Sequence, residues 1–498
     1  MTMKKIKKIL IANRGEIAVR IHRSAKEMGI QTVAIYSDPD RTAPHVLLCD
    51  EAYPLHGITS AETYLQIEKI LTIAKNAQVD AIHPGYGFLS EKEIFAKSVT
   101  NAGLIFIGPR SETIELLGSK TSARDLLVKK NIPIVPGTTK PIKNLEEAID
   151  VATSIGFPVL IKASGGGGGK GMRRVDSADE LANAIERAQN EASKAFSDDR
   201  VYIEKYIINP KHIEIQILAD MHGNVIHLGE RECSVQRRHQ KVVEECPSTA
   251  VTPELRAAMG QTAVEIAKTA GYVNAGTMEF LLDADKHFYF LEVNTRIQVE
   301  HPITEMVYGI DIIKEQIRIA QGEKLSLTQD EVRINGHAIE VRIYAEEYDN
   351  NFLPSTGIIT HYQPSEGLGV RNDSGIRAGS EITMFYDPMI AKLVAHGKTR
   401  SEAIEKMKRA LREYKINGVK TTIPFCEMVL FHPEFVNGMY DINFVAKYYL
   451  APDGMLDMKE SIAITSAFVS QNGNFGKNIV ESAGSEKHSQ WKQQFRNE

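Results

Sequence analysis

A segment in the middle of the chain holds residue types that bind metal ions. Residues 276–294 are strand-like on both sides of a turn at 283–286, which predicts a hairpin. Pairing about this turn puts four side chains on one face: Glu279, Phe290, Glu292 and Asn294. Glu279 is then expected diagonally across from Glu292. Two carboxylates and an amide suit Mg²⁺ or Mn²⁺, which take oxygen ligands, whereas two acids alone would be typical of a solvated polar face.

Polar residues continue beyond this hairpin at every second position. Arg296, Gln298 and Glu300 alternate with apolar or small residues, so they share the face of the acids if the chain stays extended. Solvent exposure alone does not explain this order of polar types. A guanidinium beside a carboxylate can hold a small oxyanion while the carboxylate takes its proton. The row therefore predicts a catalytic site.

A glycine tract precedes this site in the sequence. Residues 164–171 read SGGGGGKG, and Gly166, Gly168 and Gly171 formally satisfy GxGxxG. Strand-like rather than helical residues follow, which argues against a dinucleotide fingerprint, and Gly171 stands where a Walker A loop needs Ser or Thr. The tract predicts a flexible hairpin loop whose N–H groups close over phosphates, with a mobile surface linker as the alternative.

Basic residues form a further cluster at 236–241, which reads QRRHQK. A nucleic-acid patch is disfavoured by the overall acidity of the chain, whereas a pocket for ATP phosphates and an anionic substrate fits the same residues. Arg342 lies inside an apolar strand, and a structural ion pair with Glu340 is not expected there. We therefore predict that Arg342 binds a partner or a ligand. Lys120 and Lys162 are isolated lysines and carry little information by themselves.

The elements that position these residues fall into three regions. Residues 1 to about 118 alternate short apolar strands (8–12, 31–36, 80–83, 104–109) with helical segments such as 16–28, which predicts a parallel sheet with ligands at its carboxyl ends. In the region to about 330, strands at 157–162 and 172–175 flank the glycine tract, and longer alternating segments predict antiparallel sheet. A third region opens with a strand at 337–343 and holds a helix at 400–414.

Composition limits the class of protein. The 498 residues suffice for roughly three domains, and 59 Lys and Arg against 64 Asp and Glu give a net charge of −5. This balance disfavours a dedicated nucleic-acid binder. Four scattered cysteines without a CxxC pair indicate a reducing compartment. No apolar run reaches the roughly 20 residues of a membrane span, and the basic N-terminus has too short an apolar core for a signal peptide. We expect a soluble, cytoplasmic protein.

The ordered motifs resemble the biotin carboxylase family of the ATP-grasp superfamily. The segments that carry the resemblance are 9–18 (ILIANRGEIA), 83–91 (HPGYGFLSE), 162–171, 236–245, 294–302 (NTRIQVEHP) and 386–393 (YDPMIAKL). The resemblance covers residues 1 to about 446. It implies an α/β and α+β protein in four parts: a Rossmann-like N-terminal domain (1–118), an ATP-grasp domain (119–330) with a mobile lid at about 135–207, a biotin carboxylase C-terminal domain (331–446) and a polar extension (447–498).

The resemblance also implies roles for individual residues in the ATP-dependent carboxylation of protein-linked biotin by bicarbonate. ATP would be bound by Lys120, Lys162, Gly168, Gly169, Glu204, Lys205, Tyr206, Ile207, His212, Gln236, His239, Glu279 and Glu292. Two Mg²⁺ or Mn²⁺ ions would be held by Glu279, Glu292 and Asn294, and bicarbonate by Lys241, Arg296, Gln298 and the Val299 N–H. Glu300 would be the base, and Arg342 would bind biotin and stabilise its enolate. Carboxyphosphate would be the intermediate, and its phosphate would take the ureido proton of biotin.

The chain contains no Ala-Met-Lys-Met biotin attachment motif, so we expect the biotin carrier on another chain. The family mostly forms dimers, which implies a homodimer within a larger assembly with a carrier and carboxyltransferase subunit. The segments 418–425 and 432–435 are more similar to the biotin carboxylase subunit of two-subunit pyruvate carboxylases, with that of an acetyl-CoA or acyl-CoA carboxylase as the alternative. More distant alternatives are another ATP-grasp ligase and an inactive nucleotide-binding regulator.

Overall fold

A computed structural model describes most of the chain. The described residues are 5–118, 126–128, 130, 132–138, 140–163, 172–196, 200–238 and 240–449. Residues up to Phe444 belong to one compact unit, and a second unit begins at Val445, within helix α15 (Phe444–Tyr449). Within these described ranges, no helix combines the length and the apolar character needed to cross a membrane.

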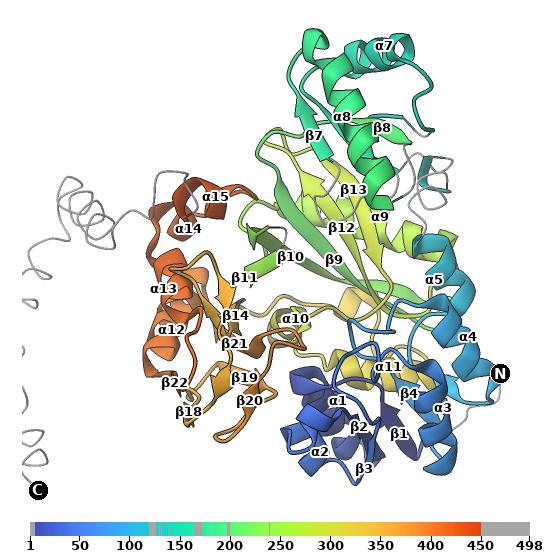
Figure 1. Ribbon diagram of the computed structural model, residues 1–498, viewed down its shortest axis with the longest axis vertical. Helices are drawn as coiled ribbons and strands as arrows, with labels where there is room; N and C mark the ends of the chain where they lie inside the picture. The colour runs from blue at the N-terminus through green and yellow to red at the C-terminus, as the bar shows by residue number, and fades with distance from the viewer. Residues whose placement is uncertain are drawn as a thin grey trace, which may run out of the picture. The chain divides into compact units, whose positions relative to one another are not determined.

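The N-terminal region is a parallel sheet with helices between its strands, as predicted (Figure 1). Its strand order is β3-β2-β1-β4-β5. The strands are β1 (Lys8–Ile11), β2 (Gln31–Tyr36), β3 (Glu51–Pro54), β4 (Ala81–His83) and β5 (Ile105–Phe106). The helices are α1 (Gly15–Glu27), α2 (Pro44–Leu48), α3 (Ile67–Asn76), α4 (Glu93–Asn101) and α5 (Ser111–Gly118). Strands β1 and β2 read as nearly continuous apolar runs because parallel strands are covered on both faces.

A small antiparallel sheet follows, in the order β7-β6-β8. It consists of β6 (Val159–Ala163), β7 (Met172–Val175) and β8 (Val201–Lys205). Helices α7 (Leu145–Ile155) and α8 (Ala178–Phe196) pack against this sheet and share its apolar core (Figure 1). Helix α7 begins where the Asn144 side chain accepts a hydrogen bond from the Glu147 N–H. The predicted strands on either side of the glycine tract are thus confirmed, and the tract itself lies outside the described residues.

An eight-stranded sheet, in which all strand pairs are antiparallel, dominates the rest of the molecule. Its order is β13-β12-β9-β10-β11-β14-β21-β19. The strands are β9 (Lys211–Ala219), β10 (Val225–Arg237), β11 (Gln240–Cys246), β12 (Asn274–Leu282), β13 (Phe288–Asn294), β14 (His337–Tyr344), β19 (Val370–Ser374) and β21 (Met389–Gly397). Glu244 of β11 pairs with Glu340 of β14, so the sheet continues across residue 331.

Strand β9 shows why this sheet can carry a buried polar site. Its sequence KHIEIQILA alternates isoleucines with Glu214 and Gln216, and both sets are buried. The isoleucines pack against helix α9 (Pro253–Thr269), which begins at the N-cap Thr252. The alternation places Glu214 and Gln216 on the opposite face of the sheet, where the polar side chains of neighbouring strands meet them.

The remaining elements frame this sheet. Helices α10 (His301–Tyr308), α11 (Ile312–Ala320), α12 (Arg400–Glu413), α13 (Ile423–Phe431) and α14 (Pro433–Val436) complete the described helices longer than one turn. Short strands are β15 (Glu346–Glu347), β16 (Leu353–Pro354), β17 (Gly357–Ile358), β18 (His361–Gln363), β20 (Glu381–Ile382) and β22 (Lys415–Asn417). Helix α10 packs across β10, β11, β14 and β21, and its N-terminus therefore lies where two regions of the chain join.

Candidate active site

The β12–β13 hairpin carries the predicted metal ligands in a register that differs from the expected one. Leu282 pairs with Phe288, and Phe280 pairs with Phe290. A bulge follows in which Leu291 has no partner, so Glu279 lies directly opposite Glu292 rather than diagonal to it. The prediction that Phe290 shares their face was wrong, because this ring packs edge-on against Phe280 in the apolar core.

Glu279 and Asn294 face the same side of the hairpin, as predicted. Asn294 Nδ2 donates to Glu279 Oε1 over 2.9 Å, and both side chains are buried. Burial alone would raise the pKa of Glu279, but Lys241 and His212 outweigh it and hold the pKa well below its usual value. With the exposed Glu292 opposite, the set offers two carboxylates and one amide oxygen. These hard oxygen donors fit Mg²⁺ or Mn²⁺.

His212 and Gln236 lie beside this carboxylate. The Gln236 amide Nε2 donates to His212 Nδ1 over 2.8 Å. The other ring nitrogen, Nε2, lies 2.8 Å from Glu279 Oε2. Two residues that were assigned to the nucleotide pocket are therefore linked to a predicted metal ligand.

Lys241 is the centre of the site, and only 12% of its side chain is exposed. Its Nζ lies 2.5 Å from Glu214 Oε2, 2.6 Å from Glu300 Oε1, 3.0 Å from Glu279 Oε1 and 3.1 Å from Gln298 Oε1. Burial by itself lowers the pKa of Lys241, but these carboxylates outweigh it and raise the pKa well above its ordinary value. Lys241 is therefore a permanent cation surrounded by acceptors.

The prediction that Arg296, Gln298 and Glu300 share one face required an extended chain. The segment from Thr295 to Glu300 is not an extended strand. Strand β13 ends at Asn294, and the chain bends and turns before helix α10. Arg296 Nε donates to Glu91 Oε2 over 2.8 Å, and Arg296 Nη2 donates to Asn294 Oδ1 over 2.9 Å. Gln298 instead joins the Lys241 group, since its Nε2 donates to Glu279 Oε1 over 2.9 Å.

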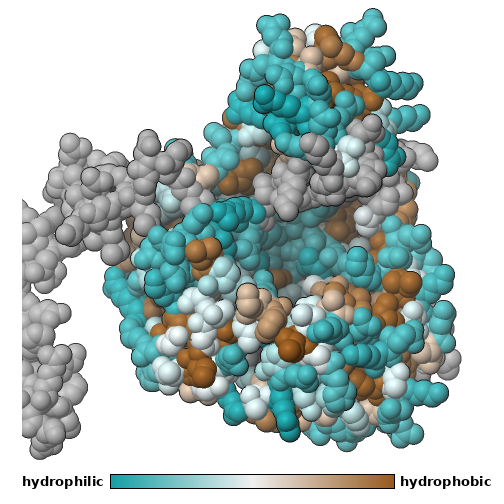
Figure 2. Space-filling view, in the orientation of Figure 1, coloured by the Kyte–Doolittle hydropathy of each residue, from teal (hydrophilic) through white to brown (hydrophobic). Residues whose placement is uncertain are grey.

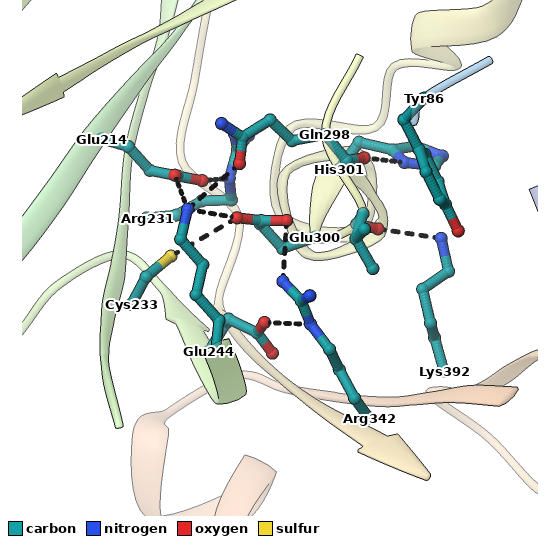
Figure 3. Close-up of polar contacts among 12 residues, drawn as sticks. Tyr86, Glu214, Arg231, Cys233, Glu244, Gln298, Glu300, His301, Arg342 and Lys392 are labelled. Atoms are coloured by element: carbon teal, nitrogen blue, oxygen red, sulfur yellow. Dashed lines mark hydrogen bonds and ion pairs between the residues drawn. The ribbon is translucent and has the colours of Figure 1, made fainter. Parts of the chain in front are cut away.

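Glu300 lies between two cations at the start of α10 (Figure 3). One carboxylate oxygen accepts from Lys241, and the other accepts from Arg342 Nη2 over 3.0 Å. Burial raises the pKa of Glu300, but Lys241 and Arg342 outweigh burial, so its pKa lies far below the usual range. Glu300 is therefore a buried, ionised carboxylate held between two cations.

Arg342 reaches Glu300 from strand β14. Its Nε also donates to Glu244 Oε1 over 2.6 Å. The expectation that Arg342 does not pair with Glu340 is confirmed, since neither oxygen of the buried Glu340 has a hydrogen-bond partner in the part of the chain that the structure describes. Burial raises the pKa of Glu244 to about 7, although Arg342 opposes this shift. Arg342 thus joins two carboxylates that differ strongly in basicity.

Sequence reasoning missed a buried ion pair beneath the site. Arg231 of β10 donates from Nε to Glu214 Oε1, from Nη1 to Gln216 Oε1 over 2.8 Å and from Nη2 to Thr277 Oγ1 over 3.1 Å. Neither Arg231 nor Glu214 has measurable solvent exposure. The signal was the alternation of Glu214 and Gln216 with isoleucines, which looks like an exposed strand face. Both residues are instead buried and bond to Arg231, which also bonds to Thr304 of α10.

The predicted lid residues form a separate group on the small sheet. Lys162 of β6 pairs with Glu204 of β8. Lys205 Nζ donates to the carbonyl oxygens of Gly156 and Phe157, at 2.8 and 3.1 Å. The Tyr206 ring lies 4.7 Å from the guanidinium of Arg174, and the next residue, Ile207, is half-buried. Lys120, Gly168, Gly169 and His239 lie outside the described residues.

The surface above the central sheet is polar. The face drawn in Figure 2 is hollowed near its centre, and the surface of this hollow is mainly hydrophilic. Strands β9, β10 and β12 occupy this part of the same view in Figure 1. A polar recess over strands that carry buried cations and carboxylates is suited to a charged substrate rather than an apolar one.

Comparison with known proteins is consistent with this geometry. Residues 5–114 match the family model described as "Biotin carboxylase, N-terminal domain". Residues 119–328 match "Carbamoyl-phosphate synthase L chain, ATP binding domain", and residues 340–447 match "Biotin carboxylase C-terminal domain". The three matches follow one another along the chain and include every described residue of the site.

Whole-chain relatives agree with these matches. "Biotin carboxylase 1" of Bacillus subtilis is 52% identical over 444 residues, which cover 89% of this chain and 99% of that protein. A pyruvate carboxylase subunit of Methanothermobacter thermautotrophicus is 51% identical over 441 residues, which cover 89% and 90% of the two chains. A crystal structure of the biotin carboxylase domain dimer of Hydrogenobacter thermophilus 2-oxoglutarate carboxylase, with MgADP, ADP and bicarbonate, is 48% identical with a TM-score of 0.84 and covers 89% of this chain and 98% of that one.

Proposed function

The chain belongs to the biotin carboxylase family and is a ligase that carboxylates biotin, and we propose that it uses ATP and bicarbonate to do so on a carrier protein. The observation that carries this proposal is the position of Glu300, ionised between Lys241 and Arg342. Such a carboxylate can accept a proton from a small acid that the cations also bind.

Bicarbonate is the small acid in this proposal. Its oxygens would be bound by Lys241, Arg296, Gln298 and the Val299 N–H. Three of these donors lie in the segment 296–299, and Lys241 contacts Gln298 of this segment. An anion bound beside Lys241 would draw this cation away from Glu300, and the added negative charge would raise the pKa of the carboxylate. Glu300 would then take the bicarbonate proton while the freed oxygen attacks the γ-phosphorus of ATP, giving carboxyphosphate and ADP.

The hairpin would serve the phosphates. Glu279, Glu292 and Asn294 would hold the divalent cations, which neutralise phosphate charge when bound. Lys162 would contact phosphate oxygens, and residues 204–207, His212 and Gln236 would complete the nucleotide pocket. The dyad of Gln236 and His212 supports this role because it places the ring Nε2 2.8 Å from Glu279 Oε2. Lys120, Gly168, Gly169 and His239 belong to the same proposed pocket by their place in the sequence.

Arg342 would act in the second half of the reaction. Carboxyphosphate breaks down to CO₂ and phosphate, the phosphate takes the ureido proton of biotin, and the resulting enolate captures CO₂. A guanidinium stabilises the enolate oxygen by charge-assisted hydrogen bonds. The position of Arg342 against Glu300 supports this assignment, because one strand then brings the biotin step next to the base.

The test measures ADP release from the purified chain with and without bicarbonate and with and without free biotin. We expect ADP release to require bicarbonate and to rise when biotin is added. Another ATP-grasp ligase would not respond to biotin, and an inactive regulator would bind ATP without releasing ADP. Either result would refute the proposed activity.

We further propose pyruvate as the final acceptor, through a partner that carries biotin and the carboxyltransferase. The support is the relative from a pyruvate carboxylase, together with the likeness of segments 418–425 and 432–435. The likeness to a propionyl-CoA carboxylase alpha chain keeps an acyl-CoA carboxylase as the second candidate. Copurification of the tagged chain from its own cells, followed by carboxylation assays with pyruvate and with acetyl-CoA, distinguishes the two and also reports the oligomeric state.

A further inference from the structure

Three residues that the proposed reaction leaves unused converge at one buried point. Glu16 comes from α1, Tyr86 from the segment after β4, and Lys392 from β21. Lys392 Nζ lies 3.1 Å from Glu16 Oε1, and the Tyr86 hydroxyl donates to the same oxygen. Lys392 has no solvent exposure, and Glu16 is 5% exposed. The three belong to three of the segments that carry the family resemblance.

Lys392 also contacts the catalytic segment. Its Nζ donates to the Val299 carbonyl oxygen over 2.8 Å (Figure 3). In the β14–β21 ladder Lys392 is the register partner of Arg342, so the two side chains stand on the same face. Lys392 and Arg342 thus contact consecutive residues of one turn from neighbouring strands. Lys392 donates to the backbone of Val299, and Arg342 donates to the Glu300 carboxylate. His301 Nδ1 holds the preceding carbonyl, that of Gln298, over 2.7 Å.

Burying Lys392 costs folding free energy, and packing alone does not require a lysine at this position. Removing an ammonium and a carboxylate from water is unfavourable, and apolar residues of similar volume often stabilise such a place as well or better. The Glu16 carboxylate compensates the charge of Lys392, and its second oxygen has no hydrogen-bond partner in the described part of the chain. What the lysine adds, beyond filling space, is the hydrogen bond to the Val299 backbone.

We propose that Lys392, with its charge balanced by Glu16, is a positioning residue that fixes the backbone at Val299. It would thereby orient the Val299 N–H and the Glu300 carboxylate toward bicarbonate. This inference rests on the proposed function, in which these two groups bind and deprotonate bicarbonate. The third region of the chain would then contact the proposed bicarbonate site through Lys392 as well as through Arg342.

The test compares Lys392→Met with the wild type in bicarbonate-dependent ADP release. A lost hydrogen bond from a charged donor corresponds to a KM for bicarbonate that rises about tenfold or more. The KM for ATP should stay within about twofold, because no ATP-binding group touches Lys392 in the proposed pocket. A variant that folds and keeps the wild-type KM for bicarbonate would overturn the proposal, as would an equal rise in both KM values.

Two further variants keep the test decisive. Lys392→Met leaves Glu16 without its cation, so the double variant Lys392→Met/Glu16→Gln should regain melting temperature while its KM for bicarbonate stays raised. Lys406→Met is the matched control, because Lys406 Nζ also donates to a backbone carbonyl, that of His396 at 3.0 Å, and pairs with Glu402 at 2.8 Å. It should leave both KM values unchanged. Absence of bicarbonate-dependent ADP release in the wild type would instead refute the proposed function itself.

Discussion

Glu279 lies directly opposite Glu292 across the β12–β13 ladder, because Leu291 is an extra residue in β13. Directly paired side chains stand about 5 Å apart at Cβ, closer than the diagonal spacing. Two carboxylates at that distance repel one another unless a cation lies between or beside them. Lys241 and His212 already contact Glu279, and in the proposed site a divalent ion would add a further cation beside the pair.

The first prediction concerns this pair. Glu279→Gln should raise the Mg²⁺ concentration needed for half-maximal ATP cleavage by about tenfold or more, since one of two charged ligands is lost. Titration of ADP release with Mg²⁺ measures this. Asp283→Asn is the control, because Asp283 belongs to an acidic cluster at the turn of the same hairpin. A similar shift in both variants would show that only the overall charge of the hairpin matters.

The second prediction concerns Glu300, the proposed base. Glu300→Gln should lower bicarbonate-dependent ADP release by about 10²-fold or more, as expected for loss of a general base. Nucleotide affinity should change only a few fold, because Glu300 does not touch the proposed ATP pocket. Binding of a fluorescent ATP analogue is the companion measurement. An equal loss of binding and turnover would reassign Glu300 to folding of the site.

The third prediction separates the two halves of the reaction. Arg342→Gln removes the cation but can still form a hydrogen bond with Glu244 or Glu300. We expect carboxylation of free biotin to fall about tenfold more than ADP release measured without biotin, since charge is needed at the enolate. Both rates should be measured on one preparation. If they fall by the same factor, Arg342 acts only by holding Glu300.

The fourth prediction concerns Glu91, which lies in a motif of the sequence but had no role assigned to it. Its carboxylate accepts from Arg296 Nε and from the Thr295 N–H, at 2.8 and 3.1 Å. Because 38% of its side chain is exposed, the pair is screened by solvent and contributes little. Glu91→Gln should therefore raise the KM for bicarbonate only about two- to fivefold. A loss as large as that of Glu300→Gln would contradict this view.

The fifth prediction follows from the raised pKa of Glu244. Burial raises this pKa from 4.5 to about 7 in the folded protein, against the effect of Arg342. The folded state thus binds the proton more tightly than the unfolded chain, so the contribution to stability is complete below pH 4.5 and is lost as pH rises through about 7. A shift of this size corresponds to at most about 3 kcal/mol.

Glu244→Gln removes this titration. Relative to the variant, the wild type should lose melting temperature between pH 5 and pH 7, and calorimetry across this range would measure the difference. A difference between the two proteins that does not change with pH would mean that Glu244 is already ionised when buried.

Most elements of the fold could be predicted from the sequence, and the reasons are local. The bounds of β2, β7 and α12 follow from periodicity and turn residues within the segments themselves. The position of Glu279 and Asn294 on one face of the hairpin was also predicted from the alternation of residues. The bulge at Leu291 could not be predicted in this way. Phe290 packs against Phe280 in the apolar core, and simple alternation along the hairpin does not reveal this contact.

The centre of the site was only partly predictable. Residue types identified Lys241 and Glu300, but their neighbours come from strands far apart in sequence. Pairing of β9 with β10 places Arg231 beside Glu214, and Glu91 and Lys392 contact the 295–300 segment from the first and third regions. Such long-range partners depend on tertiary packing. The turn before α10 is the clearest case, since its alternating sequence is typical of a strand.

The continuous sheet has a consequence for how the protein can be taken apart. Strand β11 is paired on both sides, with β10 and with β14. A fragment ending at residue 330 would expose the β14-facing edge of β11, with unpaired N–H and C=O groups. Such an edge favours association between copies. Heat should therefore melt the two regions in a single transition, and limited proteolysis near residue 331 should yield two pieces that stay together until a denaturant separates them.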